Sequence, residues 1–383
     1  MAKLGEVCIQ ITDGSHNPPS GVEQSEYLML SSKNIDDDFI TLDSPRFLSH
    51  SDYIAENKRT TVSEGDLLMT IVGTIGRVAI VPEELKGICL QRSVAVIKPE
   101  REVVNNRYLM YQLQNMRPFL EKEARGVAQK GIYLKQVSQL DIKIPELEHQ
   151  MQIVKVLDKA SKLIFLRRQQ LAKLDELVEA RFVEMFGDPV NNPMNYPKSH
   201  LGKVCDVRDG THDSPEYYDV GYPLVTSKNV TGGKIDLSEC NLISEDDYKK
   251  ICERSKVDRG DIIMPMIGTV GKPVIVNIEP MFAIKNVALI KFTPDSLVTN
   301  IYIKTLLESD YFDRAVLDKI RGGTQKFIAL GDIRKLEIIL PDLKHQQCFS
   351  AFVERVDQQK QTMQQSLDKL ELMKKALMQE YFG

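Results

Sequence analysis

Residues 146–187 form a proline-free stretch whose apolar side chains follow the spacing of a helix that packs along another helix. The apolar positions are Ile153, Leu157, Ala160, Ile164, Leu171, Leu174 and Val178. About 40 residues at about 1.5 Å per residue give a helix of roughly 60 Å, which is too long for an ordinary globular helix. This stretch therefore needs a helical partner along its length.

A second stretch, residues 342–383, supplies that partner within the same chain. Its apolar positions are Leu343, Phe349, Val353, Val356, Met363, Leu367, Leu370, Leu377 and Tyr381. Pro145 and the Glu-Leu-Glu-His-Gln that follows recur 196 residues later as Pro341 and Asp-Leu-Lys-His-Gln, and both stretches close with Phe-Gly. The pattern predicts two long helices that pair with each other.

The segments that precede the two helices repeat as well. Short motifs of the first half recur in the same order in the second half, offset by 193 to 197 residues. They include Leu-Gly-x-Val-Cys at 4–8 and 201–205, Asp-Gly-Ser/Thr-His at 13–16 and 209–212, Ser-Lys-Asn at 32–34 and 227–229, Gly-Thr-Ile/Val-Gly-Arg/Lys at 73–77 and 268–272, and Arg92-Ser93 with Lys285-Asn286. Each segment combines short β-branched runs with helical spacing at residues 106–120 or 300–317, which predicts an α+β fold.

The bulk composition limits the class of protein. A chain of 383 residues is expected to fold as two or more domains, and no apolar run approaches the ~18 residues that a membrane span needs. The six cysteines show no Cys-x-x-Cys spacing, and the start of the chain lacks the apolar core of a signal peptide, so we expect a cytoplasmic protein without a metal site. With a net charge of −4, any DNA binding has to depend on local basic loops.

No group of residues has the spacing of a catalytic site. Asn192-Pro193-Met194-Asn195-Tyr196 is faintly similar to the Asn-Pro-Pro-aromatic motif of adenine methyltransferases, but it follows no apolar strand. A glycine-rich turn that could hold a methyl donor is also missing from the sequence. We therefore interpret this segment as a turn.

The repeated loops at 73–77 and 268–272 are candidate phosphate contacts. Each carries two glycines and a hydroxyl after an apolar strand and ends in a cation, so that Thr74 with Arg77 and Thr269 with Lys272 are the candidate residues. Glycines let the backbone approach a phosphate closely, and the cation neutralises its charge. The alternative is a tight hairpin with a surface cation; the cation in both copies favours the contact.

Other polar loops that recur in the two halves complete the candidate DNA-binding set. Lysine suits a phosphate or guanine, and asparagine can bond an adenine edge through two hydrogen bonds, but a Ser-Lys-Asn motif can equally be a turn that closes a strand. The candidates are Lys33 with Asn34, Lys228 with Asn229, Arg92 with Ser93, Lys285 with Asn286, Gln129 with Lys130, Gln325 with Lys326, and the two histidines His16 and His212. Positions that differ between the copies would read different bases.

This layout resembles the specificity (S) subunit of Type I restriction-modification systems. The resemblance rests on the two Leu-Gly-x-Val-Cys starts, the paired loops at 73–77 and 268–272, the Leu-x-Ile-x-Ile/Leu-Pro strand ends and the two helices that end in Phe-Gly, and it covers essentially the whole chain. It implies two similar α/β-mixed target recognition domains, residues 1–145 and 188–341, separated by two long helices, 146–187 and 342–383. The helices would form an antiparallel coiled coil, and the internal repeat would have a pseudo-two-fold arrangement.

The family also implies a function. The chain would be a non-catalytic, sequence-specific subunit that binds double-stranded DNA at a bipartite site, with one half-site per domain. It would bind no cofactor directly; two docked modification subunits would use S-adenosylmethionine to methylate adenine N6, and restriction (motor-nuclease) subunits would join the full complex. The alternatives are a stand-alone DNA-binding or adaptor protein without methylation partners and an enzyme in its own right; the missing methyl-donor turn argues against the enzyme.

Four charged residues interrupt the apolar stripes of the predicted helices. They are Arg167, Arg181, Lys360 and Lys374. We interpret these charges as excluding homotypic helix pairing or as lying on a docking face.

Overall fold

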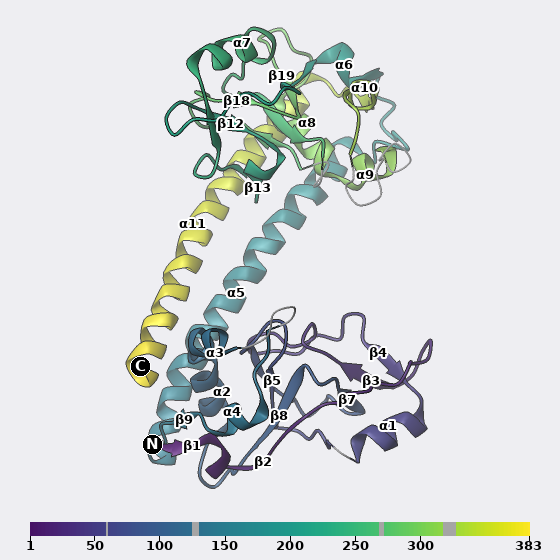
Figure 1. The fold of residues 1–383 in the computed structure, drawn as a ribbon. Helices are drawn as coiled ribbons and strands as arrows, with labels where there is room; N and C mark the ends of the chain where they lie inside the picture. The colour runs from purple at the N-terminus through teal and green to yellow at the C-terminus, as the bar shows by residue number, and fades with distance from the viewer. Residues whose placement is uncertain (59, 125–129, 268–271, 317–326) are drawn as a thin grey trace. The chain divides into compact units, whose positions relative to one another are not determined.

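The computed structural model describes residues 1–58, 60–124, 130–267, 272–316 and 327–383, which form two compact units (Figure 1). Unit 1 comprises Met1–Arg168 and Gln365–Gly383, and unit 2 comprises Gln169–Gln364. Each unit mixes small sheets with helices, which confirms the predicted α+β class. No helix in the described parts of the chain is long and apolar enough to cross a membrane.

The two predicted long helices are α5 (Leu147–Phe186) and α11 (Leu343–Phe382), each of 40 residues (Figure 1). Each unit contains the first half of one helix and the second half of the other. In unit 1, Ile153 near the start of α5 shares a core with Phe382 at the end of α11. In unit 2, Phe186 at the end of α5 packs against Phe349 near the start of α11, with ring centroids 5.4 Å apart. The helices therefore pair antiparallel within each unit: the heptad spacing predicts the pairing, and the family resemblance implies its direction.

Unit 1 contains three sheets. A four-stranded antiparallel sheet has the order β2-β8-β5-β6, a three-stranded sheet has the order β4-β3-β7 with β3 and β7 parallel, and β1 pairs with β9. The bounds are β1 Ala2–Lys3, β2 Cys8–Asp13, β3 Tyr27–Leu30, β4 Arg46–Leu48, β5 Leu67–Thr70, β6 Val78–Ile80, β7 Ile88–Leu90, β8 Val94–Pro99 and β9 Asp141–Ile142. The helices are η1 Leu4–Glu6, α1 His50–Asn57, α2 Asn106–Asn115, α3 Arg117–Glu123 and α4 Leu134–Ser138.

Unit 2 repeats these three sheets and adds a two-stranded sheet formed by β13 and β14. Its sheets have the orders β11-β19-β16-β17 and β15-β12-β18, with β12 and β18 parallel, and β10 pairs with β20. The strands are β10 Lys198–His200, β11 Asp206–Asp209, β12 Tyr222–Val225, β13 Val230–Thr231, β14 Lys234–Ile235, β15 Asn241–Ile243, β16 Ile262–Pro265, β17 Val274–Ile275, β18 Ala283–Ile284, β19 Val287–Lys291 and β20 Glu337–Ile339. The helices are α6 Leu201–Val204, η2 Ser227–Asn229, α7 Glu245–Ser255, α8 Asn300–Glu308, α9 Asp310–Val316 and α10 Leu330–Arg334. The internal repeat predicted from the sequence is confirmed.

The segments with helical spacing at residues 106–120 and 300–317 are helical in their described parts, and each consists of two helices. In unit 1 the break falls between α2 and α3, where Pro118 occupies the first turn of α3. Proline lacks the backbone N–H that a continuous helix would use there. In unit 2, Ser309 has extended backbone angles (φ −82°, ψ 160°) and separates α8 from α9.

A buried glutamine fixes the start of α5 in unit 1. The Gln150 side chain is fully buried and donates to the carbonyl oxygens of Pro145 at 2.8 Å and Val103 at 3.1 Å. Its side-chain oxygen accepts from the backbone N–H of Asn105, the N-cap residue of α2, at 2.8 Å. One side chain thus joins the beginnings of two helices.

Gln346 does the same for α11 in unit 2. It is also fully buried, donates to the carbonyl oxygens of Pro341 at 2.8 Å and Leu297 at 3.1 Å, and accepts from the N–H of Thr299 at 2.9 Å. Thr299 is the N-cap residue of α8. This equivalence explains why the His-Gln pair recurs in the two halves of the sequence.

The charges that interrupt the heptads have partners inside the chain. Lys360 of α11 forms an ion pair with Asp175 of α5 at 2.6 Å in unit 2. Arg181 lies over the ring of Phe352, 5.9 Å from its centroid, and Lys374 forms an ion pair with Asp38 in unit 1. These side chains take part in contacts within each unit, and the exclusion of homotypic pairing stays a prediction.

Candidate nucleic-acid interface

An aspartate orients a histidine at the end of the first long strand in each unit. In unit 1 the exposed His16 ring nitrogen Nε2 lies 2.7 Å from Oδ2 of the buried Asp13, and in unit 2 the same atoms of His212 and Asp209 lie 2.8 Å apart. The glycine between them is required, because a Cβ at Gly14 would lie 2.1 Å from a backbone oxygen. A buried carboxylate thus aims an exposed imidazole outward from an equivalent position in both units.

The histidine of unit 2 has a second partner. Its Nδ1 lies 2.9 Å from the side-chain oxygen of Asn286, so both ring nitrogens of His212 face oxygen atoms. The protonated ring can donate to both. The hydrogen bonds with Asn286 and then Asp209 raise the pKa of His212 above its ordinary value.

The carboxylate beneath this histidine is held in its charged form. Burial by itself raises the pKa of Asp209, but the hydrogen bond with His212 and the charge of Arg254 outweigh burial, so the pKa is lowered. Arg254, near the end of α7, forms an ion pair with the Asp209 carboxylate. Neither residue was among the predicted site residues, although Asp209 recurs in the same motif as the histidine.

The turns that follow β7 and β18 lie beside these histidines. The residues that correspond between the two turns differ from those matched in the sequence. Ser15 forms a bridge with Gln91, and Thr211 forms the equivalent bridge with Lys285. Lys285 therefore corresponds to Gln91, and the match of Lys285 with Arg92 was wrong. The N–H of Gly14 donates to the carbonyl oxygen of Val94, three residues after Gln91, whereas the N–H of Gly210 donates to that of Val287, two residues after Lys285. The turn of unit 2 is therefore one residue shorter.

Side chains in these turns point in different directions. Arg92 is exposed, and its backbone N–H donates to Ser15 O at 2.9 Å. The hydroxyl of Ser93 accepts from the N–H of Ser32 at 3.1 Å and is used within unit 1. Lys285 donates to the hydroxyl of Ser214 at 2.6 Å, while Asn286, in a left-handed conformation (φ 55°), contacts His212.

The two Ser-Lys-Asn motifs are turns closed by their asparagines. The Asn34 oxygen accepts from the N–H of Ser31 at 3.0 Å, and its amide nitrogen donates to Asp43 O at 3.0 Å. The Asn229 oxygen accepts from the N–H of Thr226 at 3.0 Å. Both asparagines are buried, so the turn interpretation fits them and we remove both from the base-reading candidates.

The lysines of the two Ser-Lys-Asn turns remain candidates. Lys33 and Lys228 each lie next to a buried asparagine, and both are exposed. Each turn therefore presents a cation to solvent at an equivalent position.

The turn at 73–77 is a tight connection between β5 and β6. Gly73 and Gly76 have φ values of 84° and 80°, which favour glycine. The Thr70 hydroxyl donates to the carbonyl oxygen of Thr74. The Thr74 side chain is exposed, and Arg77 faces Asp36 at 3.7 Å.

Residue 130 joins this turn through its backbone. The N–H of Gly73 donates to the carbonyl oxygen of Lys130 at 3.4 Å, and the Lys130 side chain is exposed. Lys272, which corresponds to Arg77 in unit 2, is exposed as well. The other four predicted residues, Gln129, Thr269, Gln325 and Lys326, lie outside the described residues.

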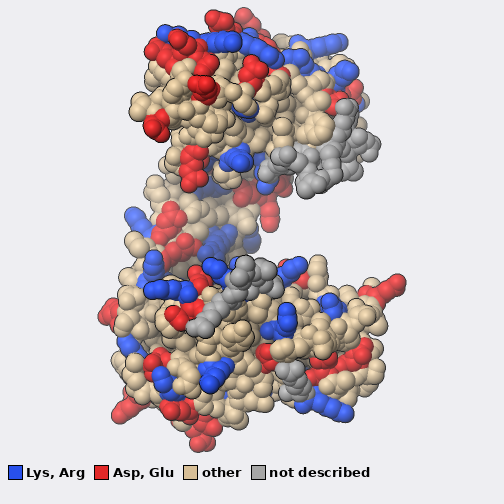
Figure 2. Space-filling view, in the orientation of Figure 1, with Lys and Arg blue, Asp and Glu red and all other residues tan. Residues whose placement is uncertain are grey.

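The candidate turns of unit 1 converge. Backbone hydrogen bonds connect Arg92 to Ser15, Ser32 to the Ser93 side chain, Ile71 to Ser93, and Gly73 to Lys130. Figure 2 shows Lys and Arg side chains interspersed with Asp and Glu over the described surface in view. The candidate cations therefore lie on individual turns, which fits the expectation from the net charge of −4 that any DNA binding depends on local basic loops.

Comparisons with known proteins identify the family. The model of the Type I restriction modification DNA specificity domain matches residues 29–176 and 193–372. The MjaVIII specificity subunit of a Type I restriction enzyme from Methanocaldococcus jannaschii is 24% identical over 341 residues, which cover 84% of this chain and 79% of the relative. The EcoBI specificity subunit from Escherichia coli is 35% identical over 100 residues, 26% of this chain and 21% of the relative.

Solved structures share the fold. The S subunit of a Type I restriction-modification system from M. genitalium aligns with a TM-score of 0.56 and 13% identity over 100% of this chain and 95% of its own. A second structure, described as showing complex assembly and conformational transition of the Type I system, aligns with a TM-score of 0.55 and 19% identity over 100% of this chain and 96% of its own. Since the domain model matches both halves of the chain, this protein belongs to the specificity subunits of Type I restriction-modification systems.

Proposed function

We propose that this chain reads a split DNA site, one half-site per unit, for adenine-N6 methyltransferase subunits that dock on it. The observation that carries the proposal is the same exposed histidine, oriented by a buried aspartate and surrounded by cation-bearing turns, in two units of equivalent topology. Two similar reading surfaces in one chain suit two separated stretches of one duplex. Residues 1–145 and 188–341 are the proposed target recognition domains, and the long helices set the spacing of the half-sites.

The proposed contacts are members of the candidate set that are exposed or partly exposed. The exposed ones are His16, Lys33, Thr74, Arg92 and Lys130 in unit 1 and His212, Lys228 and Lys272 in unit 2, and the partly exposed ones are Arg77, Lys285 and Asn286. Cations position the protein on phosphates, whereas side chains that differ between equivalent turns carry sequence information. The difference between Arg92 and Asn286, now in equivalent places, makes these two residues candidates for reading different bases.

The chemistry belongs to partners in this proposal. S-adenosylmethionine binds the modification subunits, and the target adenine has to leave the base stack before it is methylated. Restriction (motor-nuclease) subunits join the same assembly in a complete system. The chain itself contributes binding and orientation.

The first experiment tests DNA reading. Methylation-sensitive sequencing of DNA from cells that carry the chain gives the site, and the purified complex is then titrated with a duplex that contains it. Replacing Arg77, Lys130, Lys272 and Lys326 with alanine should weaken binding and flatten the salt dependence by about 0.9 in slope per lost phosphate contact. Lys344→Ala, at an exposed position in the first turn of α11, is the matched control; equal slopes for all variants would refute the placement.

The second experiment separates the alternatives. A stand-alone DNA-binding or adaptor protein purifies without a methyltransferase, whereas the proposed function requires a modification subunit to co-purify. The isolated chain should transfer no methyl group to DNA. Methyl transfer by the isolated chain would contradict a non-catalytic role.

A further inference from the structure

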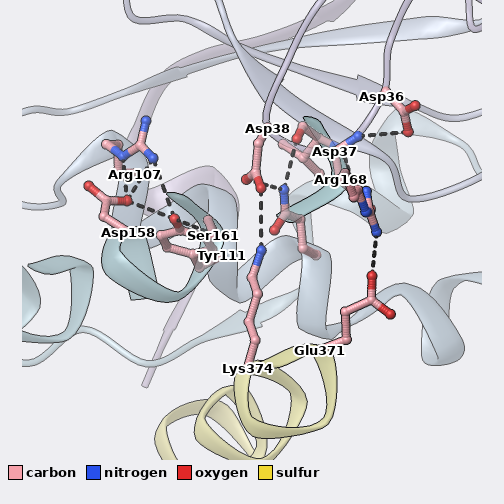
Figure 3. A network of polar contacts seen from close by, with 12 residues as sticks. Asp36, Asp37, Asp38, Arg107, Tyr111, Asp158, Ser161, Arg168, Glu371 and Lys374 are labelled. Carbon is pink, nitrogen blue, oxygen red and sulfur yellow. Dashed lines mark hydrogen bonds and ion pairs between the residues drawn. The ribbon is translucent and has the colours of Figure 1, made fainter. Parts of the chain in front are cut away.

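An acidic turn at residues 36–38 connects the helices of unit 1 to its candidate DNA-contact turn (Figure 3). Lys374, near the end of α11, points its ammonium group at this turn, with Nζ 3.3 Å from Oδ2 of Asp38. The Lys374 side chain is 17% exposed and that of Asp38 is 28% exposed, so the pair is largely shielded from solvent. Asp38 has a left-handed backbone (φ 71°), a conformation that is uncommon for non-glycine residues and that aspartate tolerates better than most.

Helix α2 fixes both members of this pair. The side-chain amide of Gln114 donates to Oδ1 of Asp38 at 3.1 Å and to the carbonyl oxygen of Val78 at 3.0 Å. The Lys374 ammonium lies 5.2 Å from the ring centroid of Tyr111, a favourable cation-π distance. Figure 3 shows Lys374 reaching from α11 to Asp38, with Tyr111 nearby. The lysine is therefore held between an aromatic ring and a carboxylate.

The other carboxylates of the turn hold the segment that we propose contacts DNA. Asp37 forms an ion pair with Arg117, whose guanidinium also donates to the carbonyl oxygen of Gly76 at 3.2 and 3.3 Å. Asp36 faces Arg77 at 3.7 Å. A chain of contacts thus runs from α11 through residues 36–38 to the turn at 73–77.

In the described part of unit 2, the positions equivalent to these carboxylates carry none. The corresponding hairpin between β13 and β14 contains Gly232 and Gly233, with φ values of 57° and 72°, and a Cβ at either glycine would meet no atom within 4 Å. Val178, which matches Lys374 in the helix repeat, packs against the apolar core of unit 2. The contact chain is therefore a feature of unit 1 among the described residues.

We propose that Lys374 is a positioning residue for DNA reading by unit 1. By holding residues 36–38, Lys374 keeps the turn at 73–77, which includes Arg77, in its place. The position of α11 within unit 1 and the reading of one half-site therefore depend on each other. Removing one partner of a shielded ion pair leaves the other uncompensated, and this loosens whatever the pair was holding. The role in DNA reading rests on the proposed function, whereas the anchoring of the turn does not.

The test uses the full chain in its complex with modification subunits. Lys374→Met removes the charge, and Asp38→Gly removes the carboxylate but suits the left-handed backbone. Both should speed amide hydrogen exchange in residues 73–78, and their effects should not add, because they break the same link. Lys374→Arg keeps the charge and should leave exchange near the wild-type rate.

DNA binding gives the second measurement. Duplexes with one or the other half-site scrambled report discrimination at each half separately. Lys374→Met should reduce discrimination at one half-site on the order of tenfold, about 1.4 kcal/mol, and leave the other half-site unchanged. Two controls remove ion pairs between α5 and α11 that do not involve a candidate turn. They are Glu371→Gln, which loses its 2.6 Å pair with Arg168 in unit 1, and Lys360→Met, which loses its 2.6 Å pair with Asp175 in unit 2.

The outcomes are separable. Unchanged exchange at residues 73–78 in both Lys374→Met and Asp38→Gly overturns the anchoring. Equal losses at both half-sites, or the same loss in Glu371→Gln, overturn the positioning role and indicate general destabilisation. A wild-type complex that ignores both half-sites refutes the proposed function and with it the role in DNA reading, but leaves the exchange result to decide the anchoring.

Discussion

The side-chain amide of Gln346 donates to the carbonyl oxygen of Leu297 at 3.1 Å, in the interior of unit 2, at the start of α11. The same side chain also bonds Pro341 and Thr299. Gln346→Met keeps the volume but leaves buried backbone groups without partners, so it should lower the free energy of unfolding by about 1–3 kcal/mol. Urea denaturation of the full chain measures this loss.

The control for this change is Gln359→Met, an exposed glutamine in the same helix. It should shift the midpoint little, because its amide lies in water. Equal shifts for the two variants would mean that the buried bonds of Gln346 contribute nothing.

Phe349 gives a prediction about packing between the long helices. It is fully buried, and its ring lies 5.6 Å from Phe182 and 5.4 Å from Phe186, centroid to centroid. Phe349→Ala should destabilise unit 2 by about 3–5 kcal/mol through the cavity it leaves. Phe165→Ala, at a 56% exposed position of α5, should cost far less in the same denaturation experiment; a comparable cost would argue against the observed pairing.

His212 gives a prediction about pH dependence. Its folded-state pKa is raised, first by the bond with Asn286 and then by Asp209. A raised pKa contributes stability that is complete below the unfolded value, about 6.5, and is lost as pH rises through the higher folded value. The destabilisation caused by His212→Gln should therefore be larger at about pH 5.5 than at about pH 8.5.

NMR titration of the imidazole checks the cause. Asn286→Gly suits the left-handed backbone and removes the amide oxygen, so it should lower the pKa of His212. A pKa that stays unchanged would assign the shift to Asp209 alone. If the protonated His212 contacts a DNA phosphate, the affinity of the complex for DNA should fall as pH rises through the same range, and His212→Gln should remove that part of the dependence.

The lysines of the Ser-Lys-Asn turns give a prediction about salt. Lys33→Ala and Lys228→Ala should each reduce the slope of log affinity against log salt by about 0.9, because each exposed ammonium is proposed to contact one phosphate. Asn34→Ala opens the turn beneath Lys33 and should reduce protein stability along with affinity, since the buried amide bonds both Ser31 and Asp43. A change in salt slope without any loss of stability in Asn34→Ala would return this residue to the DNA-contact set.

Regular spacing made the helices and the repeat readable from the sequence. The heptads of α5 and α11 are local patterns, and Phe186 and Phe382 mark their ends in both sequence and structure. The strand order β2-β8-β5-β6 is set by pairings between distant residues, which no local pattern specifies. The sequence therefore predicted an α+β class and left the sheet topology open.

The candidate site was predictable only in part. The motifs that recur located its turns, but recurrence does not distinguish Lys33, which is exposed, from Asn34, which closes the turn. The acidic residues 36–38 could not be predicted from the repeat, because the equivalent hairpin of unit 2 has Gly232 and Gly233 in place of two of the carboxylates. Their role depends on Lys374, more than 300 residues away in the chain, a pairing that only the fold discloses.

Unit 1 is assembled from two pieces of chain, Met1–Arg168 and Gln365–Gly383, whereas unit 2 is one continuous piece. Phe382 lies in the apolar core of unit 1 and contacts Tyr108 at a centroid distance of 5.3 Å. On the ribosome, the lobe that is synthesised first consequently cannot complete its core until residues 365–383 have been translated. A chain interrupted just after Gln364 would contain every residue of the second lobe but not those that complete the first.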